Sequence, residues 1–247
     1  MKKLFNWQVR LGLVFLLVST VFYSLHYRLF ADSDYIFRFL LAQLGFLPIS
    51  VFLVTTVINQ LLGRREKVAM LKKLNMVIGS FFSQVGGELL RYAAAGDEAT
   101  DRIRGELLVR PEWEPADYQR ARQLLAHFSF DLRHQRIDWP GMRDFLAREK
   151  GFLLALLGNP NLLEHETFTE LLWAVFHLAE ELGSRESVRA LPATDYEHLL
   201  GDVKRVYTLL LGQWLAYLEH LQEDYPYLFS LAVRTNPFDP EARPEVG

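Results

Sequence analysis

The sequence predicts an all-α protein: an N-terminal two-helix transmembrane hairpin followed by a cytoplasmic helical-bundle domain. Three observations support this fold class. Two long uncharged apolar runs open the chain, apolar residues further on recur at spacings of three and four, and few stretches alternate with the period of two expected for strands. The 247 residues suffice for a membrane part and one modest soluble domain.

Residues 11–25 and 39–62 contain no charged side chain. A run of this length in lipid must be helical, because backbone groups in hydrocarbon can bond only to one another. We therefore predict spans at about residues 8–28 and 37–62, within a hairpin of residues 1–63. The basic residues expected at the membrane interfaces are Arg10, Arg28, Arg38, Arg64, Arg65, Lys67, Lys72 and Lys73.

Lysines and arginines lie on the two outer flanks of the hairpin, whereas the connecting turn carries Asp32 and Asp34. Because basic flanks stay on the cytoplasmic side, we expect both termini in the cytoplasm of a multi-pass protein of the inner (plasma) membrane. A cleaved signal peptide fits less well, because no pair of small residues suitable for cleavage follows the first run. The lipid bilayer is thus the first predicted partner.

The second span contains four uncharged polar residues: Gln43, Thr55, Thr56 and Asn59. Polar side chains in lipid usually face another helix. Two interpretations follow, packing within the hairpin or a contact with another subunit.

Residues 64–95 predict a juxtamembrane amphipathic helix. Its apolar seam is Leu71, Leu74, Ile78, Phe81, Val85, Leu89 and Tyr92. Gly79, Ser83 and Gly87 recur every four residues, a spacing that allows a second helix to approach closely. The favoured interpretation is a helix that covers the soluble core. The alternatives are a short coiled coil joining two copies and a helix on the inner leaflet. This helix is also the predicted site of self-association or of a protein partner.

Residues 96–235 predict the cytoplasmic helical domain, and residues 236–247 predict an extended tail with three prolines. Trp173 and Trp214 are expected in the core or at its boundary. The expected helices are Asp97–Leu108, Pro115–His134, one opened by Asp138 and ending at Leu157, one behind a Thr167-x-x-Glu170 capping box that ends near Gly183, and a long one behind Thr194-x-x-Glu197.

No cysteine, phosphate-binding glycine loop or hydrolase motif is present, so we predict no cofactor and no enzymatic activity. The net charge of −3 does not favour a nucleic-acid partner. Weak candidates for metal ligands occur at helical spacing. They form two groups of three residues, and a further pair, His198 and Asp202, lies four residues apart. The triples are His127, Asp131 and His134, and Glu170, His177 and Glu181. Two such helix faces opposite each other would build a carboxylate–histidine site.

The function predicted first is a membrane-anchored helical interaction or regulatory module that holds its cytoplasmic domain at the inner leaflet. One alternative is an accessory or pore-forming subunit of a multi-chain channel or transporter. The other is a membrane-bound metalloenzyme that uses the histidine and carboxylate faces.

Overall fold

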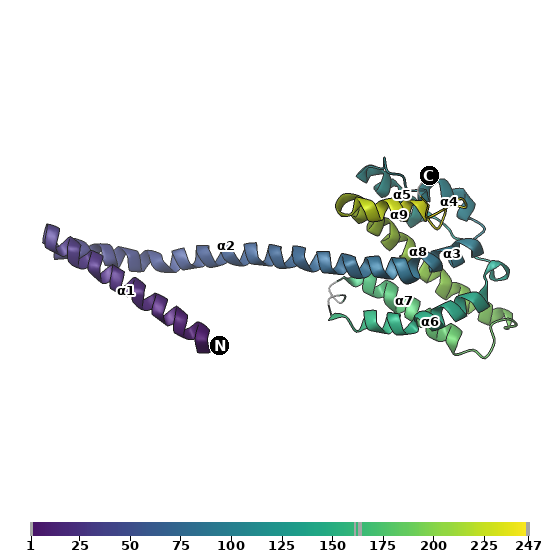
Figure 1. The fold of residues 1–247 in the computed structure, drawn as a ribbon, viewed down its shortest axis with the longest axis horizontal. Helices are drawn as coiled ribbons and strands as arrows, with labels where there is room; N and C mark the ends of the chain where they lie inside the picture. Colours follow the sequence, from purple (N-terminus) through teal and green to yellow (C-terminus); the bar gives the residue numbers. More distant parts are fainter. Residues whose placement is uncertain (1, 161, 163–164, 246–247) are drawn as a thin grey trace. The chain divides into compact units, whose positions relative to one another are not determined.

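The computed structural model describes residues 2–160, 162 and 165–245, and for residues 2–6, 8 and 62–73 it describes the backbone alone. Two compact units divide the chain, Met1–Lys67 and Val68–Gly247. In the described residues every regular element is a helix, and the only β-type pairing there is an isolated bridge between Asp97 and Leu132 (Figure 1). The predicted all-α fold, with two apolar N-terminal helices ahead of a helical domain, is confirmed.

The first unit contains helix α1 (Lys2–Phe30) and the beginning of helix α2 (Ser33–Phe81). The turn between them depends on two residues. Ala31 adopts a left-handed backbone conformation with φ of 48° and ends α1. The carboxylate of Asp32 then caps α2, because its Oδ1 accepts the Tyr35 backbone N–H at 2.9 Å.

The apolar side chains of this unit are exposed. Val9–Phe30 and Ser33–Leu61 are long and apolar enough to cross a membrane, and neither stretch is buried against other parts of the protein. Phe15 and Leu16, for example, are 65% and 66% exposed. Apolar exposure on this scale is rare on the surface of a monomeric soluble protein.

The second unit is a helical domain built around α8. This helix packs against α3, α5, α7 and α9, and α6 packs against the other side of α7 (Figure 1). The elements are the π-helical turn η1 (Phe82–Gly86), α3 (Gly87–Gly96), α4 (Thr100–Leu107), α5 (Pro115–His127), the 3-10 turn η2 (His134–Arg136), α6 (Trp139–Leu157), α7 (Glu166–Gly183), α8 (Ala193–Asp224) and α9 (Pro226–Arg234).

The predicted juxtamembrane seam lies inside this domain. Leu74, Ile78, Phe81, Val85 and Leu89 are all buried in its core. The favoured interpretation, a helix that covers the soluble core, is therefore confirmed for these residues. The seam residue Leu71 has its side chain outside the described residues, and Tyr92 is half-buried.

The predicted continuous α-helix over residues 64–95 is wrong at η1, where the helix widens by one residue. The N–H of Gly87 bonds to the carbonyl of Phe82, five residues back. The wider turn lets the consecutive Phe81 and Phe82 both enter the core, 5.3 Å apart edge to face. Gly86 is needed here, because a Cβ on it would lie 2.6 Å from Cδ1 of Phe82.

A buried carboxylate holds the segment after α5. Asp97 accepts hydrogen bonds from the backbone N–H of Ala99 (3.1 Å), the hydroxyl of Thr100 (3.0 Å) and the backbone N–H of Asp131 (2.7 Å). Residues 128–133 are consequently extended, with Phe130 buried. The predicted helix Pro115–His134 is wrong beyond His127 for this reason.

The caps of the later helices are partly as predicted. Asp138 caps α6 through the Gly141 N–H at 3.0 Å, as expected. The capping box at Thr167 is wrong, since α7 begins at Glu166 and the ring of His165 accepts the Phe168 N–H. The box at Thr194 is also wrong, because α8 begins at Ala193 behind Pro192 without a side-chain cap.

The start of the proline-containing tail is docked rather than frayed. Asn236 is buried and donates through Nδ2 to the carbonyl of Leu107 at 2.9 Å. Phe238 is buried against Trp214, with the ring centroids 5.4 Å apart. Trp214 thus lies in the core as expected, whereas Trp173 is 57% exposed and the expectation of a core or boundary position is wrong for it.

Candidate functional site

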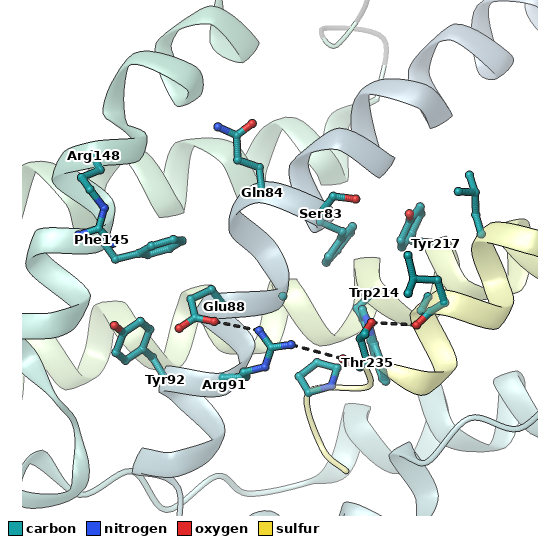
Figure 2. A pocket seen from close by; sticks show the side chains of 16 residues that line it. Ser83, Gln84, Glu88, Arg91, Tyr92, Phe145, Arg148, Trp214, Tyr217 and Thr235 are labelled. Carbon is teal, nitrogen blue, oxygen red and sulfur yellow. Dashed lines mark hydrogen bonds and ion pairs between the residues drawn. The ribbon is translucent and has the colours of Figure 1, made fainter. Parts of the chain in front are cut away.

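A cavity of about 480 Å³ lies beside η1 in the second unit (Figure 2). Its lining comes from the first residues of the π turn, from α3, α6, α8 and α9, and from the residues that follow α9. Cavities of about 300–1,000 Å³ commonly hold small molecules, and isolated π turns frequently occur at functional sites. These two features together make this cavity the candidate site.

Aromatic rings form one wall of the cavity. The rings of Phe82 and Tyr217 are stacked, with centroids 5.1 Å apart and an interplanar angle of 11°. Trp214 and Phe145 add further ring surface (Figure 2). Burial raises the pKa of the Tyr217 phenol, so its hydroxyl stays neutral. This wall therefore offers an apolar and largely rigid surface.

Charged side chains also line the cavity, and Glu88 and Arg91 lie between Phe145 and Trp214 (Figure 2). Arg91 donates through Nη1 to Oε2 of Glu88 at 2.8 Å, and through Nη2 to the carbonyl of Thr235 at 3.4 Å (Figure 2). The amide of Gln84 donates to Oε2 of Glu149 at 2.8 Å. Both carboxylates at this edge thus already have a donor from the protein.

Arg148 differs from Arg91, because it has no hydrogen-bond or ion-pair partner within the described part of the chain. Its guanidinium carbon lies 6.0 Å from the centroid of the Phe145 ring, a weak cation–π contact. The pKa of the nearby Tyr92 is raised, first by burial and next by Glu88 and Asp138, and the charge of Arg148 opposes this rise, so the hydroxyl of Tyr92 stays neutral. The cavity thus combines hydrogen-bond donors with apolar walls, the composition of a ligand-binding pocket.

The three small residues of the juxtamembrane helix lie near α8 or at the pocket. A Cβ on Gly79 would lie 3.4 Å from the Tyr217 ring, and the side chain of Ser83 is close enough to the Tyr217 hydroxyl to oppose the rise of its pKa. Gly87 lines the pocket, and its Cβ would lie 3.2 Å from the carbonyl oxygen of Phe82. The close approach that the spacing predicts is made here by Tyr217, within the same domain.

The first predicted metal triple is not assembled. His127 is the last residue of α5, Asp131 lies in the extended segment, and His134 begins η2 with its ring stacked on Tyr196 at 4.5 Å. Because the helix ends at His127, the three side chains do not share a helix face, and that prediction is wrong.

The second triple, Glu170, His177 and Glu181, is only partly assembled. Glu170 is exposed, whereas His177 and Glu181 meet His198 and Asp202 of α8. Nε2 of His198 lies 3.5 Å from both Glu181 and Asp202, and Nε2 of His177 lies 3.7 Å from Asp202 and 3.9 Å from Glu181. We refer to these four side chains as the histidine–carboxylate cluster.

An arginine joins this cluster to the start of α8. Arg185 binds Oε2 of Glu181 at 2.9 Å and both carboxylate oxygens of Asp195 at 2.6 and 2.8 Å. These hydrogen bonds lower the pKa of the Glu181 and Asp195 carboxyls. Within the described residues no group of three or more His, Asp or Glu side chains is arranged to hold a metal ion. The cluster lies between α7 and α8, and the ion pairs of Arg185 with Glu181 and Asp195 connect the two helices.

Within the described part of the chain, the four polar side chains of the second apolar helix form no hydrogen bond to the first helix. Thr56 donates to the carbonyl of Phe52 in its own helix at 2.8 Å. Gln43, Thr55 and Asn59 are exposed and have no hydrogen-bond partner for their side chains in the described part of the chain. Of the interface residues, Arg10, Arg28 and Arg38 are exposed. The side chains of Arg64, Arg65, Lys67, Lys72 and Lys73 lie outside the described residues.

Sequence reasoning missed the pocket residues Glu88, Arg91, Arg148 and Tyr217. The one available signal was the Gly86-Gly87 pair inside a helical pattern, because two adjacent glycines are unfavourable in a regular helix and mark an irregular turn. Nothing in the local sequence distinguishes Arg148 from Arg143, the other arginine of its helix.

These features define a class, an all-α protein with an apolar helical N-terminal part and a helical domain. Comparison with known proteins gives the family. Residues 2–62 match the model described as "MJ1433, N-terminal helical domain", and residues 70–234 match "Uncharacterized protein MJ1433, C-terminal helical domain". The chain belongs to the MJ1433 family.

A relative in Methanocaldococcus jannaschii, described as "Uncharacterized protein MJ1433", is 47% identical over 231 residues, which are 94% of this chain and 92% of the relative. No solved structure matches the chain.

Proposed function

We propose that this protein is a membrane-anchored helical module whose hairpin crosses the inner membrane twice and holds an interaction or regulatory domain at the inner leaflet. The observation that carries the proposal is the exposure of the apolar side chains in Val9–Phe30 and Ser33–Leu61. A monomeric soluble protein rarely exposes apolar patches of more than a few hundred Å². Lipid is the environment in which these side chains are stable.

The helix lengths support the same proposal. The 22 residues of Val9–Phe30 extend about 33 Å at 1.5 Å per residue, close to the roughly 30 Å hydrocarbon core of a bilayer. The 29 residues of Ser33–Leu61 extend about 44 Å, a length that tilting accommodates.

The proposed topology can be tested with single cysteines, because the chain contains none. Asp34→Cys reports on the turn of the hairpin, and Glu241→Cys reports on the tail. In intact cells a membrane-impermeant maleimide should label the cysteine at position 34 and leave that at position 241 unlabelled until the membrane is permeabilised. Equal labelling of both positions in intact cells, or recovery of the unmodified chain in the soluble fraction, would contradict the proposal.

A second candidate function is a subunit of a multi-chain membrane assembly. It is favoured by the side-chain amides of Gln43 and Asn59, which lack a partner within the described residues. Amides in lipid are stabilised by hydrogen bonds between helices, worth up to about 1–2 kcal/mol each. The variant carrying Gln43→Leu and Asn59→Leu should then lose oligomers seen by crosslinking in membranes, whereas Thr56→Val, whose hydroxyl bonds within its own helix, should retain them.

A further inference from the structure

The pocket beside η1 is lined by two arginines, Arg91 and Arg148, and both side chains are exposed to solvent. Arg91 is paired with Glu88 at 2.8 Å, but Arg148 has no such partner in the described part of the chain (Figure 2). An arginine that faces a cavity presents donors in a planar fork, a geometry that suits carboxylate, sulfonate or phosphate groups.

Four carboxylates lie near this part of the pocket, those of Glu88, Glu149, Asp138 and Asp144, and none forms an ion pair with Arg148 within the described residues. The carboxylate of Glu88 accepts from Arg91, and that of Glu149 accepts from Gln84. The lining residues include two guanidinium groups, those of Arg91 and Arg148, and one carboxylate, that of Glu88, so the lining has a net charge of +1. The lining therefore favours a ligand with one negative charge over a neutral or cationic one.

The remaining lining defines the body of the ligand. Trp214, Leu231 and Pro237 are apolar, and the Phe82 ring is fixed by its stack on Tyr217. A cavity of about 480 Å³ lies at the lower end of the usual range for small-molecule sites. It suits a compact aromatic or branched aliphatic group better than a two-chain lipid.

We propose that this pocket binds a small organic anion with an apolar body, with its acidic group paired to Arg148 and its body against Trp214 and Phe82. The hydroxyl of Tyr92 and the second face of Arg91 supply further donors beside the acidic group. Binding at this site does not depend on whether the hairpin crosses a membrane, so the two proposals succeed or fail separately.

The test uses the full-length protein in lipid nanodiscs and two probes of the same shape, 1-naphthoate and its neutral counterpart 1-naphthamide. Isothermal titration calorimetry measures each affinity after subtraction of the signal from empty nanodiscs. We expect one naphthoate per chain, bound about tenfold or more tightly than naphthamide, because a hydrogen bond between two charged groups is stronger than one to a neutral amide.

Two variants and a control assign the binding to the pocket. Arg148→Met should weaken naphthoate about tenfold and change naphthamide far less, since it removes the guanidinium charge and its donors but keeps an unbranched side chain. Ala232→Phe fills the cavity from α9 and should abolish both, with circular dichroism used to verify that it folds. Arg205→Met replaces an exposed arginine of α8 outside the lining and should bind both probes as the unmodified protein does.

Dodecanoate, added as a competitor, distinguishes two sources of such an anion. Displacement of naphthoate by dodecanoate at low concentration indicates a fatty acid from the membrane, and failure to displace indicates a compact soluble anion. The proposal is wrong if naphthoate shows no saturable binding above empty nanodiscs, or if Arg148→Met binds it as tightly as the Arg205→Met control.

Discussion

Replacement of Asp97 tests whether this buried carboxylate holds the domain together. Its Oδ1 accepts two backbone N–H groups, from Ala99 and Asp131, and its Oδ2 accepts the hydroxyl of Thr100. Asp97→Ala leaves these donors without their acceptor in a site that is 2% exposed. Hydrogen bonds to charged groups contribute about 1.5–3 kcal/mol each and do not add fully, so we expect a loss of about 4 kcal/mol in unfolding free energy.

The substitution Asp97→Asn separates geometry from charge. The amide oxygen can keep both backbone hydrogen bonds. The amide nitrogen is a donor, so the Thr100 hydroxyl would have to rotate and accept a hydrogen bond from it. We expect a loss of about 1–2 kcal/mol, smaller than for alanine. Asp101→Ala is the matched control, because this carboxylate pairs with Arg104 while 76% exposed, and such pairs contribute at most about 1 kcal/mol.

Thermal unfolding of the full-length protein in mild detergent measures these differences. Trp139 and Trp214 are buried in the domain, so their fluorescence reports its unfolding. For a domain of this size 1 kcal/mol corresponds to about 2–4 °C, so Asp97→Ala should lower the midpoint by about 8–16 °C. A midpoint for Asp97→Ala within about 2 °C of that for Asp101→Ala would refute the reasoning.

Two further predictions concern the ion-pair network and the π turn. Because the Glu181 and Asp195 carboxyls have lowered pKa values in the folded protein, the stability that Arg185 confers is present at neutral pH and is lost as the pH falls below about 4. Arg185→Met should therefore lower the urea midpoint at pH 7, and the difference should shrink at about pH 3.5; an equal difference at both pH values would contradict it. Gly86→Ala should destabilise by about 1–3 kcal/mol through the contact with Phe82, whereas Gly105→Ala, with open space around it, should be neutral or stabilising, and a melting experiment in which both behave alike would count against the role of Gly86.

The sequence predicted correctly several features that depend on residues within a single helix, such as the buried face of a helix and the cap at Asp138. The two apolar runs and the seam of Leu74, Ile78 and Phe81 could be predicted because helical periodicity alone specifies which face is buried. The cap at Asp138 was predictable for the same reason, since the acceptor lies three residues from its donor.

The remaining features depend on contacts between residues far apart in the chain. The end of α5 at His127 follows from the hydrogen bond between Asp131 and Asp97, 34 residues earlier, and no local pattern shows it. The histidine–carboxylate cluster needed the relative position of α7 and α8. The sequence showed that His177 and Glu181 share one face, but it also grouped Glu170 with them, which the structure leaves apart.

The docked segment after α9 has a practical consequence for work on this family. The match to the C-terminal helical domain ends at residue 234, two residues before Asn236. A protein shortened at that boundary would lose the side chain that bonds to Leu107 and would uncover Trp214, which also lines the pocket. Such a truncation should aggregate or bind ligands poorly for reasons unrelated to its biological role, so shorter versions of the domain should extend at least through Asp239.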